Sequence, residues 1–183
     1  MKVPKNAKIP ENAGDEDRPI VSNVLNASQF SIPRPSWAVR CAAFDLRVFG
    51  REAWPLAVWE HELASELASY RALVRPGGIS ANPDIVALGG VSHGPDAEIL
   101  TLGVSSGERG QGIGAALLDE LRTIAWEGKA EQVFLEVRAG DSGAAARRLY
   151  LSRGFEEVGR RPGYYHGEDA LIMNVHREYT SCP

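Results

Sequence analysis

The chain has 183 residues, 44% of them hydrophobic, which suffices for one domain with a buried core. Its net charge is only −4 and its 20 basic residues are spread along the chain, so no basic block suggests contact with nucleic acid. Two cysteines make no disulfide framework, and no apolar run reaches membrane-spanning length. We therefore expect a cytoplasmic protein that binds neither nucleic acid nor a membrane directly.

The N-terminal residues 1–35 are rich in Lys, Asn, Asp, Glu and Pro and contain one weak apolar cluster, IVSNVL. Because this composition offers little apolar surface to bury, it predicts a disordered tail. The pattern then becomes globular and predicts a single domain over residues 36–178, followed by a short C-terminal tail at 179–183.

The domain is expected to begin with a strand, formed by the run WAVRCAAF from Trp37. The runs LRVFGREAW and LAVWEHELASE have apolar residues at helical spacing, as at Leu56, Trp59 and Leu63, and Pro55 separates them. The runs YRALVR, DIVALGGVSH and EILTLGV then predict three strands. Since the turn signals PGG and GPD separate these runs, we expect an antiparallel meander.

The next segment changes to a helical period, with Ile113, Leu117, Leu121 and Ile124 on one face. QVFLEVRAG predicts a strand, and GAAARRLYLSRG a short helix that Gly154 ends. FEEVGRR and ALIMNVH predict two last strands around the loop PGYYHGED. This order of elements predicts an α/β domain with a mixed sheet.

The stretch RGQGIGA, from Arg109 to Ala115, opens the long helix with three glycines. Free N–H groups at a helix start bind phosphate, and glycines let the backbone approach it closely. A dinucleotide would fit the pattern G-x-G-x-x-A, with Glu136 downstream, and coenzyme A would fit R-x-x-G-x-G. A tight turn without a ligand is a third possibility. The residues SSGER between Val104 and the glycines, and the few strand–helix units that remain, argue against the dinucleotide.

The segments ILTLGVSSGERGQGIGAALL, VFLEVRAGDSGAAARRLYLSRGFEEVGRR and GYYHGEDALIM resemble the GNAT-superfamily N-acetyltransferases. The combination of LEVR, LY…GF and YY…EDA is similar to the RimI type, the ribosomal-protein alanine N-acetyltransferases. The resemblance covers about Trp37 to Arg177. It implies the GNAT fold, an α/β domain with a mixed, mostly antiparallel sheet, splayed central strands and flanking helices.

The resemblance also implies a site for acetyl-CoA, the co-substrate. Its pantetheine arm would insert between strands at Glu98–Val104 and Gln132–Val137. Where the family carries an Asn contact, this sequence is about two residues longer and has Gly143. Asp141 or Ser142 is expected to replace that Asn, as a polar contact or as the helix N-cap. The residues implied at this site are Leu102, Gly103 and Val104 for pantetheine, Arg109, Gly110, Gln111, Gly112, Ile113, Gly114 and Ala115 for the pyrophosphate, and Ser142 and Gly143.

Two residues are candidates for acid–base chemistry. Glu136 interrupts an apolar strand, where a carboxylate needs either a partner or a task, so it is the candidate base. The alternative is a structural ion pair, for example with Arg138, and Glu98 is the second candidate base. Tyr150 matches the position at which the family has the acid that protonates the thiolate; the alternative is an ordinary core tyrosine.

The acceptor is expected to be the α-amine of an alanine-starting ribosomal protein. Trp54, Tyr164 and Tyr165 would shape its groove together with Glu98, from the first loop and from the loop between the last two strands. The four histidines have no metal-like spacing, so we expect no metal. Other acceptor amines, a dinucleotide-dependent oxidoreductase and a non-catalytic acyl-CoA-binding module are the alternatives that the sequence leaves open.

Overall fold

The computed structural model describes residues 29–75 and 84–177. Residues 1–28 of the predicted N-terminal tail and the C-terminal tail at 179–183 lie outside this range. At 29–35 the structure differs from the predicted tail, because Phe30 is buried in the core and Ser31 forms a β-bridge with Ala72. The folded domain thus begins several residues before position 36.

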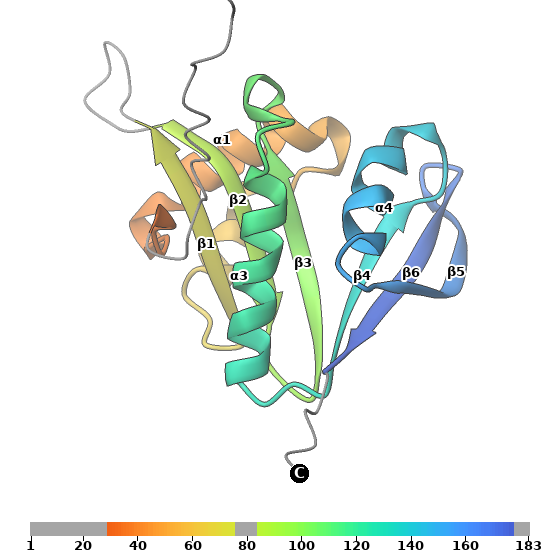
Figure 1. Ribbon diagram of the computed structural model, residues 1–183. Helices are drawn as coiled ribbons and strands as arrows, with labels where there is room; N and C mark the ends of the chain where they lie inside the picture. The colour runs from red at the N-terminus through yellow and green to blue at the C-terminus, as the bar shows by residue number, and fades with distance from the viewer. Residues whose placement is uncertain (1–28, 76–83, 178–183) are drawn as a thin grey trace, which may run out of the picture.

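A six-stranded sheet runs through the domain in the order β1-β2-β3-β4-β6-β5 (Figure 1). Its neighbours β3 and β4 run parallel, and the other neighbouring pairs are antiparallel. This confirms the predicted mixed sheet and the predicted antiparallel meander. The strands are β1 (Ala68–Arg75), β2 (Asp84–Ser92), β3 (Asp96–Val104), β4 (Gln132–Arg138), β5 (Glu156–Tyr165) and β6 (Glu168–His176).

Helices cover both faces of the sheet. Helix α3 (Ile113–Glu127) crosses one face over β2 and β3, α1 (Ala38–Phe49) and α2 (Leu56–Glu62) lie on the other, and α4 (Ala144–Leu151) lies beside β4 (Figure 1). The core is correspondingly divided into two clusters of buried side chains, one around α3 and one around α1. The predicted apolar face of α3 is confirmed, with three members fully buried and Ile124 packed at the margin.

The predicted first strand is wrong, because WAVRCAAF belongs to helix α1. Its buried residues, Ala38, Cys41, Phe44 and Asp45, follow a helical spacing, while Val39 remains exposed. The run is short, apolar and rich in Ala, and such a run cannot be assigned to strand or helix from periodicity alone.

Two adjacent glycines in β2 allow close packing on both faces of the sheet. A Cβ on Gly89 would meet Leu121 of α3 at 2.8 Å, and a Cβ on Gly90 would meet the ring of Tyr70 at 2.3 Å. Tyr70 is the cross-strand partner of Gly90, so its ring lies over the glycine. The pair therefore belongs inside the strand, as predicted from the apolar residues around it.

We expect Gly90→Ala to lower the free energy of unfolding by about 1–3 kcal/mol, since the new methyl group would overpack against the Tyr70 ring. Gly107→Ala is the matched control, because a Cβ there meets nothing within 4 Å and the backbone is not left-handed. Urea unfolding of both variants checks this, and equal midpoints would show that the Tyr70 ring moves away without cost.

Candidate active site

The site is built around the parting of β3 and β4. Their register ends at the pair Glu98–Phe134, although β3 continues to Val104 along β2 and β4 continues to Arg138 along β6. The two halves of the sheet diverge beyond this point (Figure 1). A register shift at Gly90/Val91 in β2 lies opposite the start of the separation and bends the sheet there.

The backbone of β3 presents alternate residues to the gap. The Ser105 N–H donates to the Val86 carbonyl at 2.8 Å, so alternation directs the groups of Gly103 toward β2 and those of Leu102 and Val104 toward the gap. The prediction that Gly103 pairs with pantetheine therefore needs correction. Its absent side chain matters instead, because a Cβ there would meet Phe49 of α1 at 3.0 Å.

The glycine turn leads directly into α3. Gly110 and Gly112 have φ of 78° and 79°, the left-handed region, and a Cβ on either would meet nothing within 4 Å. Gly112 is the N-cap of α3, and no side chain caps the helix. The first N–H groups of a helix have no partner inside it and lie at the positive end of its dipole. The turn thus offers open space and N–H donors to an anion such as a diphosphate.

The other predicted residues of this turn contribute in different ways. The Arg109 Nε donates to the Val104 carbonyl at 3.0 Å, so the side chain braces the turn against β3. Ile113 is buried in the core, while Gln111 is exposed. A Cβ on Gly114 would lie 3.6 Å from both Leu149 of α4 and Val104 of β3, which shows that α4 closes against the far end of the gap. Ala115 continues the helix, half-buried.

Before α4, the chain makes a tight 3-10 turn at Asp141–Gly143. Gly143 is buried, and a Cβ there would lie 2.1 Å from the Arg138 carbonyl, so an Asn side chain does not fit at this position. Gly143 itself is the N-cap of α4 without any side-chain cap, which corrects the expectation that Asp141 or Ser142 caps the helix. Ser142 is exposed, 3.4 Å from both oxygens of Glu168.

Two carboxylates face the α1 side of the gap. Leu135 and Val137 belong to the core on the α3 side, so Glu136 between them points to the opposite face. Ala97 and Ile99 on β3 belong to the same core, so Glu98 between them also points to the α1 side, and partial burial together with the Glu136 charge raises its pKa. The Glu136 carboxylate accepts an ion pair from Arg161 of β5 at 3.0 Å. Arg138, the partner expected from the sequence, is engaged elsewhere.

Arg138 joins the β4–β6 half of the sheet to the α1–α2 connection. Its guanidinium forms ion pairs with Glu52, in the α1–α2 connection, and with Glu168 at the start of β6. It also lies 4.5 Å from the centre of the Tyr165 ring. The bond from Arg138 and the one from the Gly140 N–H lower the pKa of Glu168. Sequence spacing did not pair Glu52 or Glu168 with Arg138, although Glu168 belongs to the motif YY…EDA, because this cluster depends on the β5–β6 register and on the α1–α2 connection.

Tyr164 and Tyr165 lie at the end of strand β5, not in a loop as predicted. The hairpin turn is shorter and centres on His166 and Gly167, both with positive φ. The Tyr165 hydroxyl is 3.4 Å from the Glu136 carbonyl, and burial together with the Glu136 charge raises the pKa of Tyr165 to about 12. Burial and Glu136 also raise the pKa of the more exposed Tyr164.

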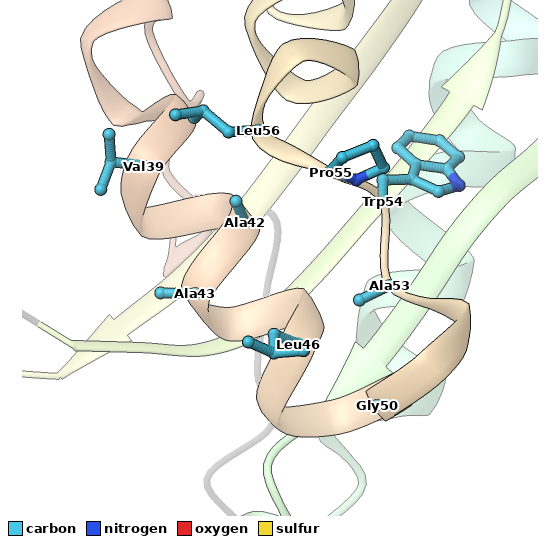
Figure 2. Close-up of a pocket in the computed structure, with 9 residues that line it drawn as sticks. All are labelled: Val39, Ala42, Ala43, Leu46, Gly50, Ala53, Trp54, Pro55 and Leu56. Atoms are coloured by element: carbon cyan, nitrogen blue, oxygen red, sulfur yellow. The ribbon is translucent and has the colours of Figure 1, made fainter.

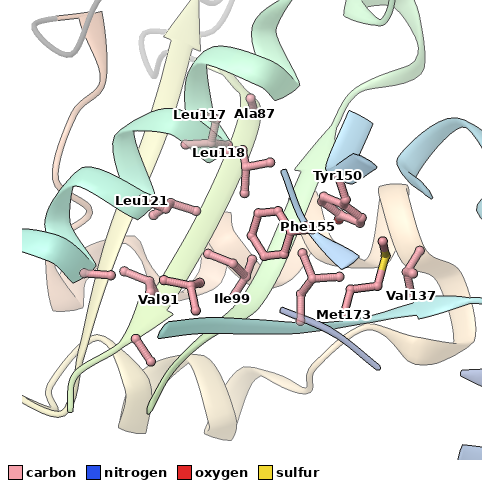
Figure 3. Close-up of a cluster of buried hydrophobic side chains, with 14 of the residues drawn as sticks. Ala87, Val91, Ile99, Leu117, Leu118, Leu121, Val137, Tyr150, Phe155 and Met173 are labelled. Carbon is pink, nitrogen blue, oxygen red and sulfur yellow. The ribbon is translucent and has the colours of Figure 1, made fainter. Parts of the chain in front are cut away.

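Tyr150 lies on the other face of the sheet, on helix α4. It is buried on α4 with its ring centre 5.9 Å from that of Phe155 (Figure 3). Burial raises its pKa, and proximity to Tyr165 adds to the shift. A raised phenol pKa means that the hydroxyl keeps its proton at neutral pH, so Tyr150 can donate a hydrogen bond or a proton.

Trp54 is held by a buried carboxylate that the sequence did not single out. The backbone N–H of Trp54 donates to the Asp45 Oδ2 of α1 at 2.6 Å, and the indole N–H of Trp59 lies 3.4 Å from the same oxygen. Burial raises the pKa of Asp45. Because the two N–H groups satisfy the carboxylate, Asp45 anchors the α1–α2 connection and with it Trp54.

An apolar hollow of about 360 Å³ lies on the outer side of this connection, between α1 and the segment from Ala53 to Leu56 (Figure 2). The Trp54 ring points away from the hollow, toward the sheet. Within residues 29–75 and 84–177, no group of three potential metal ligands occurs and no helix is long and apolar enough to cross a membrane.

Comparisons with known proteins agree with this geometry. The model of the acetyltransferase (GNAT) family matches residues 43–155. An N-alpha-acetyltransferase RimI of Mycobacterium tuberculosis is 38% identical over 139 residues, 74% of this chain and 84% of that protein. An uncharacterized protein of Mycobacterium leprae is 35% identical over 86% of this chain, but the match covers only 41% of that protein.

A solved structure supports the fold at lower identity. The ribosomal-protein-S18-alanine N-acetyltransferase of Escherichia coli superposes with a TM-score of 0.70 at 24% identity, over 84% of this chain and 97% of that one. The match to the GNAT family model and to the RimI relative overturns the dinucleotide-dependent oxidoreductase as an explanation of the glycine turn. Because the family model spans more than half of the chain, and the RimI relative is similar over most of its own length, this protein belongs to the GNAT family of acetyl-CoA-dependent N-acetyltransferases and is of the RimI type.

Proposed function

We propose that this enzyme transfers acetyl to the α-amine at a protein N-terminus, and that its acceptor is an alanine-starting ribosomal protein. The observation that carries the reaction is that Glu136 faces the α1 side of the sheet at the β3–β4 gap, while Tyr150 is buried on α4 on the opposite face. The choice of acceptor is supported by the RimI relative, and by the S18-alanine acetyltransferase that shares the fold. A ribosomal acceptor would be met in the cytoplasm.

The donor site fits coenzyme A in two respects. The turn from Arg109 to Gly112 and the uncapped start of α3 would hold the pyrophosphate through backbone N–H groups. The gap-facing groups of Leu102 and the Val104 N–H would pair with the pantetheine arm, as a further strand would, while the Val104 carbonyl is bound by Arg109. Ser142 is the remaining polar candidate near α4. Acetyl-CoA supplies an acyl group that a neutral amine can attack directly.

The protein's own residues would handle the protons. The acceptor amine must lose a proton to become nucleophilic, and Glu136, directly or through water, is the proposed base, with Glu98 beside it. An α-amine has a pKa of about 7.7–8.0 against about 10.4 for lysine, so a carboxylate base suffices for it. Tyr150 would protonate the departing thiolate, since a tyrosine hydroxyl carries its proton at neutral pH and can donate it.

The acceptor chain would enter from the α1 side, where both carboxylates face. Trp54 and Tyr164 lie on segments that flank this entrance, and Tyr165 lies deeper, beside Glu136. Rigid aromatic side chains offer contact area to a peptide at little entropic cost. The Arg138 ion pairs hold these segments together and would set the width of the groove.

A peptide with a free N-terminal alanine is expected to be acetylated, whereas the same peptide with a blocked N-terminus and an internal lysine is not. The lower pKa of the α-amine and a groove for a chain end both favour this outcome. Mass spectrometry of the two peptides after incubation with acetyl-CoA measures it. Comparable rates would instead indicate a lysine acetyltransferase, and acetylation of free amines alone would indicate a small-molecule acceptor.

Gly112→Val should abolish acetyl-CoA binding and leave the protein folded. The branched side chain resists the positive φ and fills the space left for the pyrophosphate. Gly94→Val is the control, since Gly94 also has a positive φ and open surroundings, but lies in the β2–β3 turn. Isothermal calorimetry decides: unchanged affinity in Gly112→Val would mean that the turn has only a structural role.

Tyr150→Phe should lower kcat by about 10²–10⁴-fold, the usual contribution of a general acid, with little change in acetyl-CoA affinity. The ring and its packing on Phe155 are kept. Tyr70→Phe is the control, because it also removes a hydroxyl from a buried tyrosine, one bonded to Glu62 away from the gap. Steady-state kinetics measures this loss. Wild-type turnover in Tyr150→Phe would mean that Tyr150 is only a core residue.

A further inference from the structure

Arg161 forms an ion pair with Glu136, the carboxylate proposed as the base. Its guanidinium is 3.0 Å from the Glu136 Oε1, and lies 4.8 Å from the centre of the Tyr164 ring. The Arg161 side chain is 52% exposed, whereas that of Glu136 is only 16% exposed. The cation therefore covers the solvent side of a carboxylate that is otherwise enclosed.

The adjacent arginines Arg160 and Arg161 have different partners, and only Arg161 contacts Glu136. The two arginines are adjacent on β5, the edge strand, and are almost equally exposed. Successive side chains of a strand point to opposite faces. Arg160 accordingly contacts Asp169 and Glu157 and has no contact with Glu136. One member of the pair thus faces the site and the other faces away.

Arg161 offsets one of the two negative charges at Glu98 and Glu136. Glu98 faces Glu136 from β3, Tyr164 and Tyr165 face it from β5, and within the described part of the chain no ion pair involves Glu98. The Arg161 charge opposes the upward shifts in the pKa of Glu98, Tyr164 and Tyr165. Without Arg161, two neighbouring carboxylates would share the entrance to the gap.

We propose that Arg161 is a positioning residue that holds the Glu136 carboxylate in the absence of an acceptor and yields this place to the acceptor's ammonium group. The inference rests on the proposed role of Glu136. An α-amine arrives largely protonated at neutral pH, so one positive charge replaces another and the charge of the cluster is conserved. A half-exposed side chain on an edge strand can leave an ion pair at little cost.

The experiment compares Arg161→Gln, Arg161→Lys and the matched control Arg160→Gln, with an N-terminal alanine peptide as acceptor. In Arg161→Gln the acid limb of kcat/KM should move up by roughly 0.5–1 pH unit, because the Arg161 charge no longer opposes the upward shift in the pKa of Glu98 beside the base. On the plateau above this limb, the KM for the peptide should fall roughly two- to five-fold, since no internal cation competes with the acceptor.

The controls separate this role from a structural one. Arg161→Lys should restore the wild-type pH profile, and Arg160→Gln should keep it, with an unchanged KM for acetyl-CoA in all variants. If the acid limb of Arg161→Gln coincides with that of Arg160→Gln, or if its KM for the peptide rises, the proposal is wrong. Glu136→Gln tests the foundation independently: full activity in that variant would remove Glu136 as the base, whereas loss of activity with unaltered Arg161 profiles would overturn only the inference about Arg161.

Discussion

The structure depends on one interruption of backbone hydrogen bonding, the parting of β3 and β4 beyond Glu98 and Phe134. Backbone groups inside a sheet must find partners, and those on the open side of β3 have none in β4. The enzyme family to which the chain belongs uses a thioester donor with an extended arm, and an extended arm can supply such partners. The rest of the fold keeps the gap open, with α4 on one face and the α1–α2 connection on the other.

Electrostatics at the gap follow from the same separation. With the strands apart, Glu98 and Glu136 are neighbours without a ladder between them, and partial burial together with the Glu136 charge raises the pKa of Glu98. Two arginines compensate in different ways. Arg138, half-buried, bridges Glu52 and Glu168 and so ties the β4–β6 half of the sheet to the α1–α2 connection. Arg161, more exposed, neutralises the carboxylate at which the acceptor would arrive.

The elements that could be predicted from the sequence were those with a strong local signal. The period of α3, the apolar runs of the strands and the turn signal GPD identified the correct structure, while the turn signal PGG lies outside the described residues. Helix α1 was mistaken for a strand because its short, Ala-rich run suits either state until the sheet shows which face is covered. Tyr164 and Tyr165 were expected in a loop because Pro162 and Gly163 precede them, yet β5 continues through a bulge to pair Tyr165 with Glu168.

The sequence by itself determined the family, the glycine turn and the three side chains to which the proposed chemistry is assigned, Glu98, Glu136 and Tyr150, since these depend on short motifs and residue types. Only the tertiary structure decided which residues contact these side chains and which way the neighbouring backbone points. Arg161 rather than Arg138 pairs with Glu136. The backbone N–H and carbonyl of Gly103 point toward β2, and the backbone at Gly143 has no room for a side chain beside the Arg138 carbonyl. Each of these outcomes depends on strand register and on contacts between residues distant in the chain, and local spacing does not encode either.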